Sequence, residues 1–164
     1  MGRKHVITGF FVFVLLTIAV LTGWGNVHSN KHSLNISELI AKENINDISL
    51  TIYYLNPLTL TRYPLSAEDL ISFTDVHKIV INGNDLKKHF ELFKRINDGV
   101  LMPVKKKSRV DARIYYVLES KTNGKLFDVT MWGKENSMFV NGLEVKGNEI
   151  FYDVIRPFLP EDAV

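Results

Sequence analysis

The chain has no cysteine among its 164 residues. No disulfide can support its core, and thiol nucleophiles and cysteine metal ligands are excluded. The sequence also contains no Gly-x-Ser-x-Gly nucleophile turn and no glycine-rich phosphate loop. The motifs that usually identify an enzyme are therefore missing, and we expect a non-enzymatic protein that holds no metal and no cofactor.

An excess of charge is missing as well. The chain has 20 basic and 18 acidic residues; Arg3 and Lys4 are two of the basic ones, so 18 of each sign remain after them. Nucleic-acid-binding domains usually carry a basic excess, so we expect no nucleic-acid partner. The one dense basic cluster is a loop of Lys105, Lys106, Lys107 and Arg109, which we interpret as solvated; an anionic surface or an acidic partner is the alternative.

What the sequence does contain is an export signal. Arg3-Lys4-His5 stand before an apolar run from Val6 to Leu21, the pattern that export machinery reads. We therefore expect residues 1–25 to be a signal peptide or membrane anchor, 26–33 a polar tether, and 34–164 a single extracytoplasmic domain. That domain would face the periplasm or the cell exterior.

Cleavage and retention of this leader both fit the sequence. Gly23-Trp24-Gly25 offers the small residues that a signal peptidase requires, which predicts secretion after cleavage near Gly25. Val6 to Trp24 is also long enough to cross a bilayer as a retained helix, with Trp24 at the interface. The sequence leaves both alternatives open.

Apolar periodicity in the remaining chain predicts an α+β domain. We expect a mainly antiparallel sheet, made of an N-terminal hairpin and a C-terminal four-strand meander, covered by two or three amphipathic helices. Asn123-Gly124 and Asn141-Gly142 predict type I′ turns. The expected strands are 48–54, 58–63, 77–82, 111–119, 125–132, 138–140 and 143–145, and the expected helices are 36–44, 67–73, 85–98 and 149–155.

Aromatic residues on the strands are the candidate binding residues. Adjacent tyrosines in a strand point to opposite faces, so one of each Tyr-Tyr pair should lie outside the helix-covered core. Exposed Tyr and Trp beside Arg are common in protein-binding hot spots. We therefore expect an interface with another envelope protein, as in an inhibitor or an immunity protein, formed by Tyr53, Tyr63, Tyr115, Arg113 and Trp132.

Two other functions remain open. Asp75 with His77, and Asp85 with His89 four residues along one helix, are carboxylate and imidazole pairs that a metal or small-ligand site of a minor enzyme would use. Both pairs are also ordinary turn and helix-cap residues. The second alternative is a membrane-anchored accessory or assembly factor, for which the leader would be retained.

Overall fold

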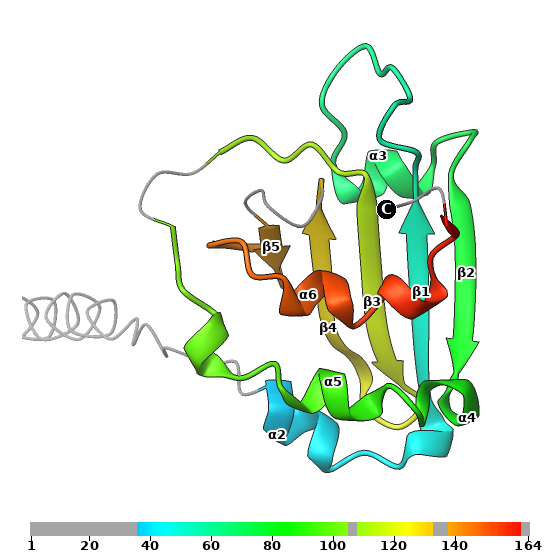
Figure 1. Cartoon of the computed structure of the whole chain (residues 1–164), viewed down its shortest axis with the longest axis vertical. Helices are drawn as coiled ribbons and strands as arrows, with labels where there is room; N and C mark the ends of the chain where they lie inside the picture. The colour runs from blue at the N-terminus through cyan, green and yellow to red at the C-terminus, as the bar shows by residue number, and fades with distance from the viewer. Residues whose placement is uncertain (1–35, 105–107, 133–137, 162–164) are drawn as a thin grey trace, which may run out of the picture. The chain divides into compact units, whose positions relative to one another are not determined.

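A computed structural model describes residues 36–104, 108–132 and 138–161 (Figure 1). Internal contacts separate Leu34–Val164 from Met1–Ser33 as a unit of its own. The predicted leader and tether, together with Lys105 to Lys107, lie outside the described residues. Within the described part of the chain, no helix combines the length and the apolar character that crossing a bilayer requires.

The domain is built on one six-stranded sheet in the order β2-β1-β3-β4-β5-β6, with every neighbouring pair antiparallel (Figure 1). The predicted α+β class and the four-strand meander β3 to β6 are confirmed. The strands are β1 (Ile48–Tyr54), β2 (His77–Asn82), β3 (Ile114–Ser120), β4 (Gly124–Met131), β5 (Met138–Val140) and β6 (Leu143–Val145).

The predicted N-terminal hairpin is wrong in its second strand. Residues 58–63 form a loop, and the strand that pairs with β1 on that side is β2, from Tyr54 opposite His77 to Ser49 opposite Asn82. The other side of β1 is taken by β3. Because both sides of β1 are occupied, residues 58–63 have no strand position left beside it.

In the part of the chain that the structure describes, five short α-helices and three 3₁₀ turns accompany the sheet. Four of the helices cover one face of the sheet, whereas α3 packs on the other face (Figure 1). The expectation of two or three covering helices is thus corrected to several shorter ones on both faces. The helices are α2 (Ile36–Ala41), α3 (Ala67–Ile71), α4 (Gly83–Leu86), α5 (Phe90–Lys94) and α6 (Ile150–Asp153), and the 3₁₀ turns are η1 (Ile45–Asp47), η2 (Asp98–Val100) and η3 (Arg156–Phe158).

The single long helix predicted over 85–98 is divided into α4 and α5. The apolar face was nevertheless predicted well, because Leu86, Phe93 and Ile96 are all fully buried in the core. Gly99 lies in η2 and does not have the positive φ expected of a helix C-terminus. Apolar spacing therefore identified which side chains are buried but not where the backbone stays helical.

The two Asn-Gly turns differ from each other. At Asn141-Gly142 both residues have positive φ, 48° and 75°, as the predicted type I′ turn requires. At the first turn only Gly124 is left-handed, with φ 69°, and the register shifts between Leu118 and Glu119. This connection is therefore a longer loop with a bulge, so the type I′ prediction is wrong there.

The main core lies between the sheet and its four covering helices. Tyr116 is fully buried at its centre, and its hydroxyl donates to the carbonyl oxygen of Phe151 in α6 at 2.9 Å. Burial raises the pKa of Tyr116 well above its usual value. This hydrogen bond fixes the C-terminal helix against the middle of the sheet.

Candidate functional site

The structure brings the predicted interface residues to one end of the sheet. Strand β1 ends there at Tyr54, which lies opposite Ile114 at the start of β3, and Ile114 in turn lies opposite Met131 at the end of β4. Tyr53, Tyr115, Arg113 and Trp132 each lie within one residue of these three positions. The loop that follows β1 carries Tyr63. We call this end of the molecule the loop end of the sheet.

Tyr53 and Tyr115 form a cross-strand pair on the face that carries α3. Their ring centroids are 6.0 Å apart, and the Lys78 ammonium lies 5.5 Å from the centroid of the Tyr53 ring. Both tyrosines are half-buried against a second, smaller apolar cluster. Burial, followed by the negative charges of Asp128 and Glu119, raises the pKa of Tyr115 to about 12. The alternation argument correctly assigned this pair to the face away from the main core.

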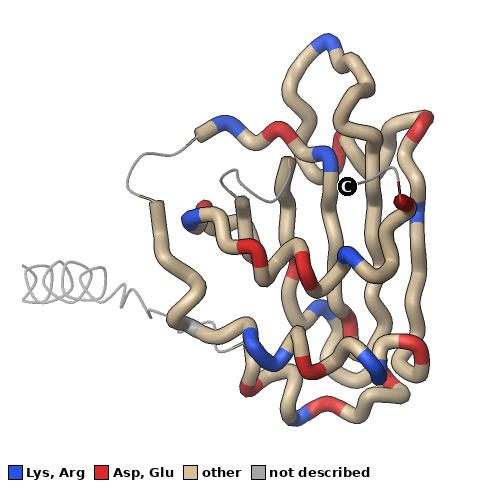
Figure 2. Tube along the Cα trace, in the orientation of Figure 1, with Lys and Arg blue, Asp and Glu red and all other residues tan. Residues whose placement is uncertain are grey.

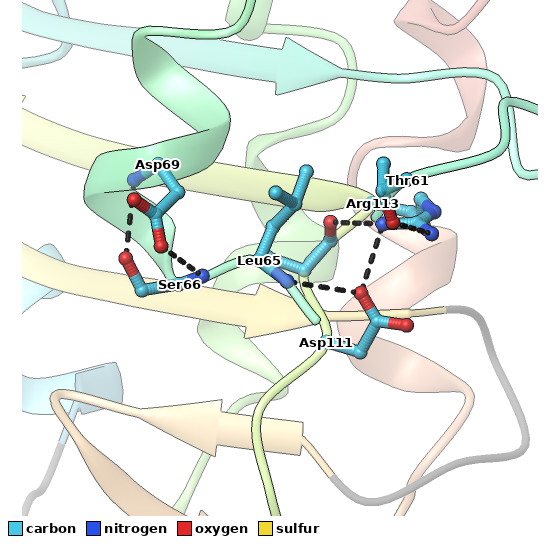
Figure 3. A network of polar contacts seen from close by, with 7 residues as sticks. Thr61, Leu65, Ser66, Asp69, Asp111 and Arg113 are labelled. Atoms are coloured by element: carbon cyan, nitrogen blue, oxygen red, sulfur yellow. Dashed lines mark hydrogen bonds and ion pairs between the residues drawn. The ribbon is translucent and has the colours of Figure 1, made fainter. Parts of the chain in front are cut away.

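Arg113 is buried rather than exposed on the surface, and Figure 3 shows it beside Thr61 and Asp111. It is only 6% exposed. Its guanidinium donates from Nη1 to Asp111 Oδ1 at 2.8 Å and from Nη2 to Thr61 Oγ1 at 3.0 Å. Asp111 Oδ1 also accepts from the backbone N–H of Leu65 at 3.2 Å. Arg113 is therefore not the exposed contact residue that the sequence suggested. Its guanidinium instead supports the loop after β1 from below.

Two backbone hydrogen bonds close the loop at its base. Leu55 donates its N–H to the carbonyl of Arg113 at 2.8 Å, and Ala112 donates to the carbonyl of Leu65 at 2.8 Å. Beyond Leu65, Ser66 caps α3 in a reciprocal capping box with Asp69, which lowers the pKa of that carboxyl (Figure 3). Both ends of the loop are thus held in place.

The loop over residues 56–64, which we call the apolar loop, displays large apolar side chains to solvent. Leu58 is 86% exposed, Leu60 is 96% exposed and Tyr63 is 60% exposed. Scattered exposed apolar residues are ordinary, but three within six positions of a fixed loop are a concentrated patch. Sequence reasoning found only Tyr63, because Leu58 and Leu60 were assigned to a strand. The flanking Pro57 and Pro64 were the available signal for a loop.

Charge is nearly absent from this part of the chain. Between Asp47 and Glu68 the only charged residue is Arg62. Figure 2 accordingly draws most of this part of the chain in tan. Elsewhere basic and acidic residues are interspersed along the trace. The apolar loop therefore contains a single charged residue, Arg62.

Trp132 completes the loop end on the neighbouring strands. It is 43% exposed. It lines a pocket of about 310 Å³ together with the segment before β3 that contains Arg109 and Asp111. Aromatic and charged groups thus meet in one hollow. The pocket is lined by Ser108, Arg109, Val110, Asp111, Thr130, Met131, Trp132 and Phe139.

The predicted basic loop is fixed at both of its described ends by one residue. Ser108 donates to the Glu144 carboxylate from its N–H at 2.8 Å and from its hydroxyl at 2.6 Å. The N–H of Val104 donates to the backbone carbonyl of the same glutamate at 3.2 Å. Arg109 is exposed beside this anchor. The Glu144 anchor was missed because a glutamate in a short strand has no distinguishing sequence signal.

The alternative ligand residues do not converge in the way that their spacing suggested. Asp85 lies in α4 and His89 immediately precedes α5, so the single helix face expected to bring them together does not exist. The His77 ring is stacked 6.2 Å from that of Tyr54. Asp75 is exposed in the turn before β2. Within the described residues, no three His, Asp or Glu side chains gather closely enough to hold a metal ion.

A second hollow of about 480 Å³ lies between the end of α5 and the start of α6. Two of its polar residues are already engaged: Asn97 Oδ1 accepts from Gly99 N–H at 2.9 Å, and Asn148 Oδ1 accepts from Ile150 N–H at 3.0 Å. Each of these side-chain amides stabilises the turn in which its own residue lies. The hollow contains none of the residues that the sequence singled out.

Comparison of the chain with protein-family models, with curated proteins and with solved structures gives no match in any of the three.

Proposed function

We propose that this chain is an exported or membrane-anchored, non-enzymatic envelope protein whose domain binds another protein through the loop end of its sheet. The observation that carries the proposal is the apolar loop, where Leu58, Leu60 and Tyr63 are exposed on a backbone braced by Arg113. Burying one leucine side chain stabilises an association by about 1.5–3 kcal/mol. A fixed loop also loses little conformational entropy on binding.

The nature of the patch favours a protein partner with an apolar groove. Tyr63 and Trp132 are residue types enriched in binding hot spots, and the half-buried pair Tyr53 and Tyr115 extends the same end of the sheet. Arg62 adds one cation at the rim, where charge mainly steers association. The partner is expected to present apolar side chains with a carboxylate at their border.

The proposal is tested with the full chain carrying a C-terminal affinity tag, recovered from envelope extract. We expect the wild type to retain a specific protein that the Leu58→Ser, Leu60→Ser double variant loses. Leu143→Ser is the matched control, because Leu143 is 60% exposed on β6, away from the loop. Recovery of the same proteins by all three chains would contradict the proposal.

The export part of the proposal has a separate test. The chain is expressed with its own leader in a bacterial host, and its mass and membrane fraction are measured. A mass beginning near Asn26 in the soluble envelope fraction identifies a cleaved leader, whereas intact Met1 in the membrane fraction identifies an anchor and favours the accessory-factor form of the proposal. Intact chain in the cytosol would contradict export in either form.

A further inference from the structure

The backbone at the tip of the apolar loop is free of hydrogen bonds. Within the described part of the chain, neither the N–H nor the carbonyl of Leu60 or Thr61 has a hydrogen-bond partner. These two residues lie outside every helix, strand and turn, between the turn after Asn56 and the bend at Arg62. In Figure 1 the loop between β1 and α3 projects beyond the end of β1. A short stretch of main chain is therefore available to pair with another protein.

Side-chain exposure alternates along this stretch. Leu58, Leu60 and Arg62 are exposed, whereas Thr59 and Thr61 between them are half-buried. Such alternation is typical of an extended chain, in which successive side chains point in opposite directions. Leu60 is 96% exposed, more than any other large hydrophobic residue that the structure describes. The loop therefore presents Leu60 outward from an extended main chain.

Hydrogen bonds hold the loop on both sides of Leu60. Before it, the carbonyl of Asn56 accepts from the N–H of Thr59 at 2.9 Å and closes a turn. After it, the Thr61 hydroxyl accepts from the buried Arg113 guanidinium at 3.0 Å. The two backbone hydrogen bonds at the base of the loop complete this support. The shape of the loop is thus maintained before a partner binds, which lowers the entropic cost of binding.

We propose that the partner is a serine protease with an apolar specificity pocket, and that the apolar loop inhibits it by lying in its substrate cleft with Leu60 in that pocket. This inference rests on the proposed function, because it names the partner of the same loop. A serine protease selects its substrate by the side chain that enters its S1 pocket, which is a hydrophobic slot in chymotrypsin and contains an aspartate in trypsin. Leu60 fits the first kind of pocket.

The free main-chain groups distinguish this partner from a purely apolar groove. Burying the N–H and carbonyl groups of Leu60 and Thr61 without new hydrogen bonds would cost free energy and offset the gain from the leucine. The partner must therefore pair with an extended main chain and also take one apolar side chain into a pocket. Recognition of an extended peptide combines these two contacts, and a protease cleft supplies both. A groove that receives a helix supplies neither.

The supports around Leu60 make the loop an inhibitor rather than a substrate. When the protease serine attacks the Leu60 carbonyl carbon, the bond to the Thr61 nitrogen breaks, that nitrogen takes up the serine proton, and Leu60 becomes an ester of the enzyme. Thr61 stays hydrogen-bonded to Arg113, and the base of the loop holds both halves in place. The new amine therefore remains beside the ester. Its reverse attack restores the peptide bond and the serine before water hydrolyses the ester.

Inhibition is measured with the full chain against chymotrypsin and subtilisin, two proteases that accept apolar side chains in S1. We expect the wild type to inhibit at least one of them. Leu60→Asp should raise the inhibition constant at least about 30-fold, the loss typical of a hot-spot residue. Leu58→Ser on the same loop should still inhibit, and Leu143→Ser on β6 should inhibit as the wild type does. Circular dichroism establishes that each variant is folded.

A second pair of variants tests the support under the loop. Thr61→Val removes the hydroxyl that accepts from Arg113, whereas Thr61→Ser keeps it. Mass spectrometry after incubation with the inhibited protease should show cleavage between Leu60 and residue 61 that is faster in Thr61→Val than in wild type. Thr61→Ser should be cleaved as slowly as the wild type. General unfolding would instead produce cuts throughout the chain, so the position of the cut separates the two causes.

Three results would overturn the proposal. They are a folded wild-type chain that inhibits neither chymotrypsin nor subtilisin, inhibition of trypsin alone, which would assign the pocket to Arg62, and rapid cleavage after Leu60 without inhibition. The proposed function has a separate outcome. If the envelope extract still yields a protein that the Leu58→Ser, Leu60→Ser variant loses, binding through the apolar loop stands and only the protease assignment is wrong.

Discussion

Arg113 and Asp111 form an ion pair of 2.8 Å in which the arginine side chain is 7% exposed and the aspartate side chain 38% exposed. The cation is thus enclosed while its counter-ion reaches the surface. Since the same guanidinium also donates to Thr61, this pair determines how firmly the apolar loop is held.

Replacing Asp111 by alanine should destabilise the domain. The change leaves the buried Arg113 without its charged acceptor and frees the Leu65 N–H. Losing a hydrogen bond to a charged group costs about 1.5–3 kcal/mol, and the exposure of Asp111 places the expected loss at the lower end. Urea unfolding measures it. Asp75→Ala, at an exposed aspartate, should change stability by no more than about 0.5 kcal/mol; equal effects of the two changes would rule out the ion pair as the cause.

Alanine at Gly83 should also destabilise the fold, because its Cβ would stand 1.6 Å from the carbonyl oxygen of Ile45. The obstructing atom is backbone, so either η1 or the end of β2 must move. Overpacking of this kind costs about 1–3 kcal/mol. Gly99→Ala is the control, because the nearest atom there is the Asn97 side-chain oxygen at 3.0 Å. Thermal unfolding that does not distinguish the two variants would contradict the packing at Gly83.

Removal of the Tyr116 hydroxyl should weaken the attachment of α6. Tyr116→Phe leaves the carbonyl of Phe151 without this donor in a fully buried site. The expected loss is about 1 kcal/mol. Relative to wild type, amide hydrogen exchange in the variant should accelerate more in α6 than in β1. Tyr63→Phe, at a hydroxyl on the exposed loop, should leave both measurements unchanged; an unaltered α6 in Tyr116→Phe would refute the prediction.

Stability should fall with pH in the alkaline range, and Tyr115 should contribute to that fall. Its pKa is raised from the usual 10.0 to about 12 in the folded protein. Above pH 10 the unfolded chain releases this proton while the folded chain keeps it, so the contribution of Tyr115 is present below pH 10 and is lost as the pH approaches 12. Urea midpoints measured between pH 9 and the alkaline limit should decrease more for wild type than for Tyr115→Phe. Parallel decreases would contradict the shift.

The sequence predicted strands 48–54 and 77–82 with their observed bounds, because the first alternates apolar and polar residues and the second contains the β-branched run Ile79-Val80-Ile81. Residues 58–63 alternate equally well, but alternation does not say whether the apolar side has anything to pack against. Leu58 and Leu60 remain in solvent. They are exposed because β1 pairs with β2 and β3 and leaves no place for a further strand beside it. These pairings join residues far apart in the sequence, so local alternation does not reveal them.

The candidate site was predicted in part for a similar reason. Alternation identified the face of Tyr53 and Tyr115 correctly. Residue type alone suggested that Arg113 was exposed, whereas its environment is set by Thr61, which lies 52 residues away in the sequence. The Asp85 and His89 pair depended on one uninterrupted helix, and that helix divides between them.

The position of α6 has a consequence for how the protein is made. Phe151, Val154 and Ile155 are fully buried, and they fill the core between strands that were synthesised much earlier. A nascent chain that ends before Glu149 lacks these side chains and leaves the helix-facing side of its sheet partly bare. The domain should therefore remain loosely collapsed until this segment has left the ribosome, so that folding of the whole domain waits for the last part of the chain.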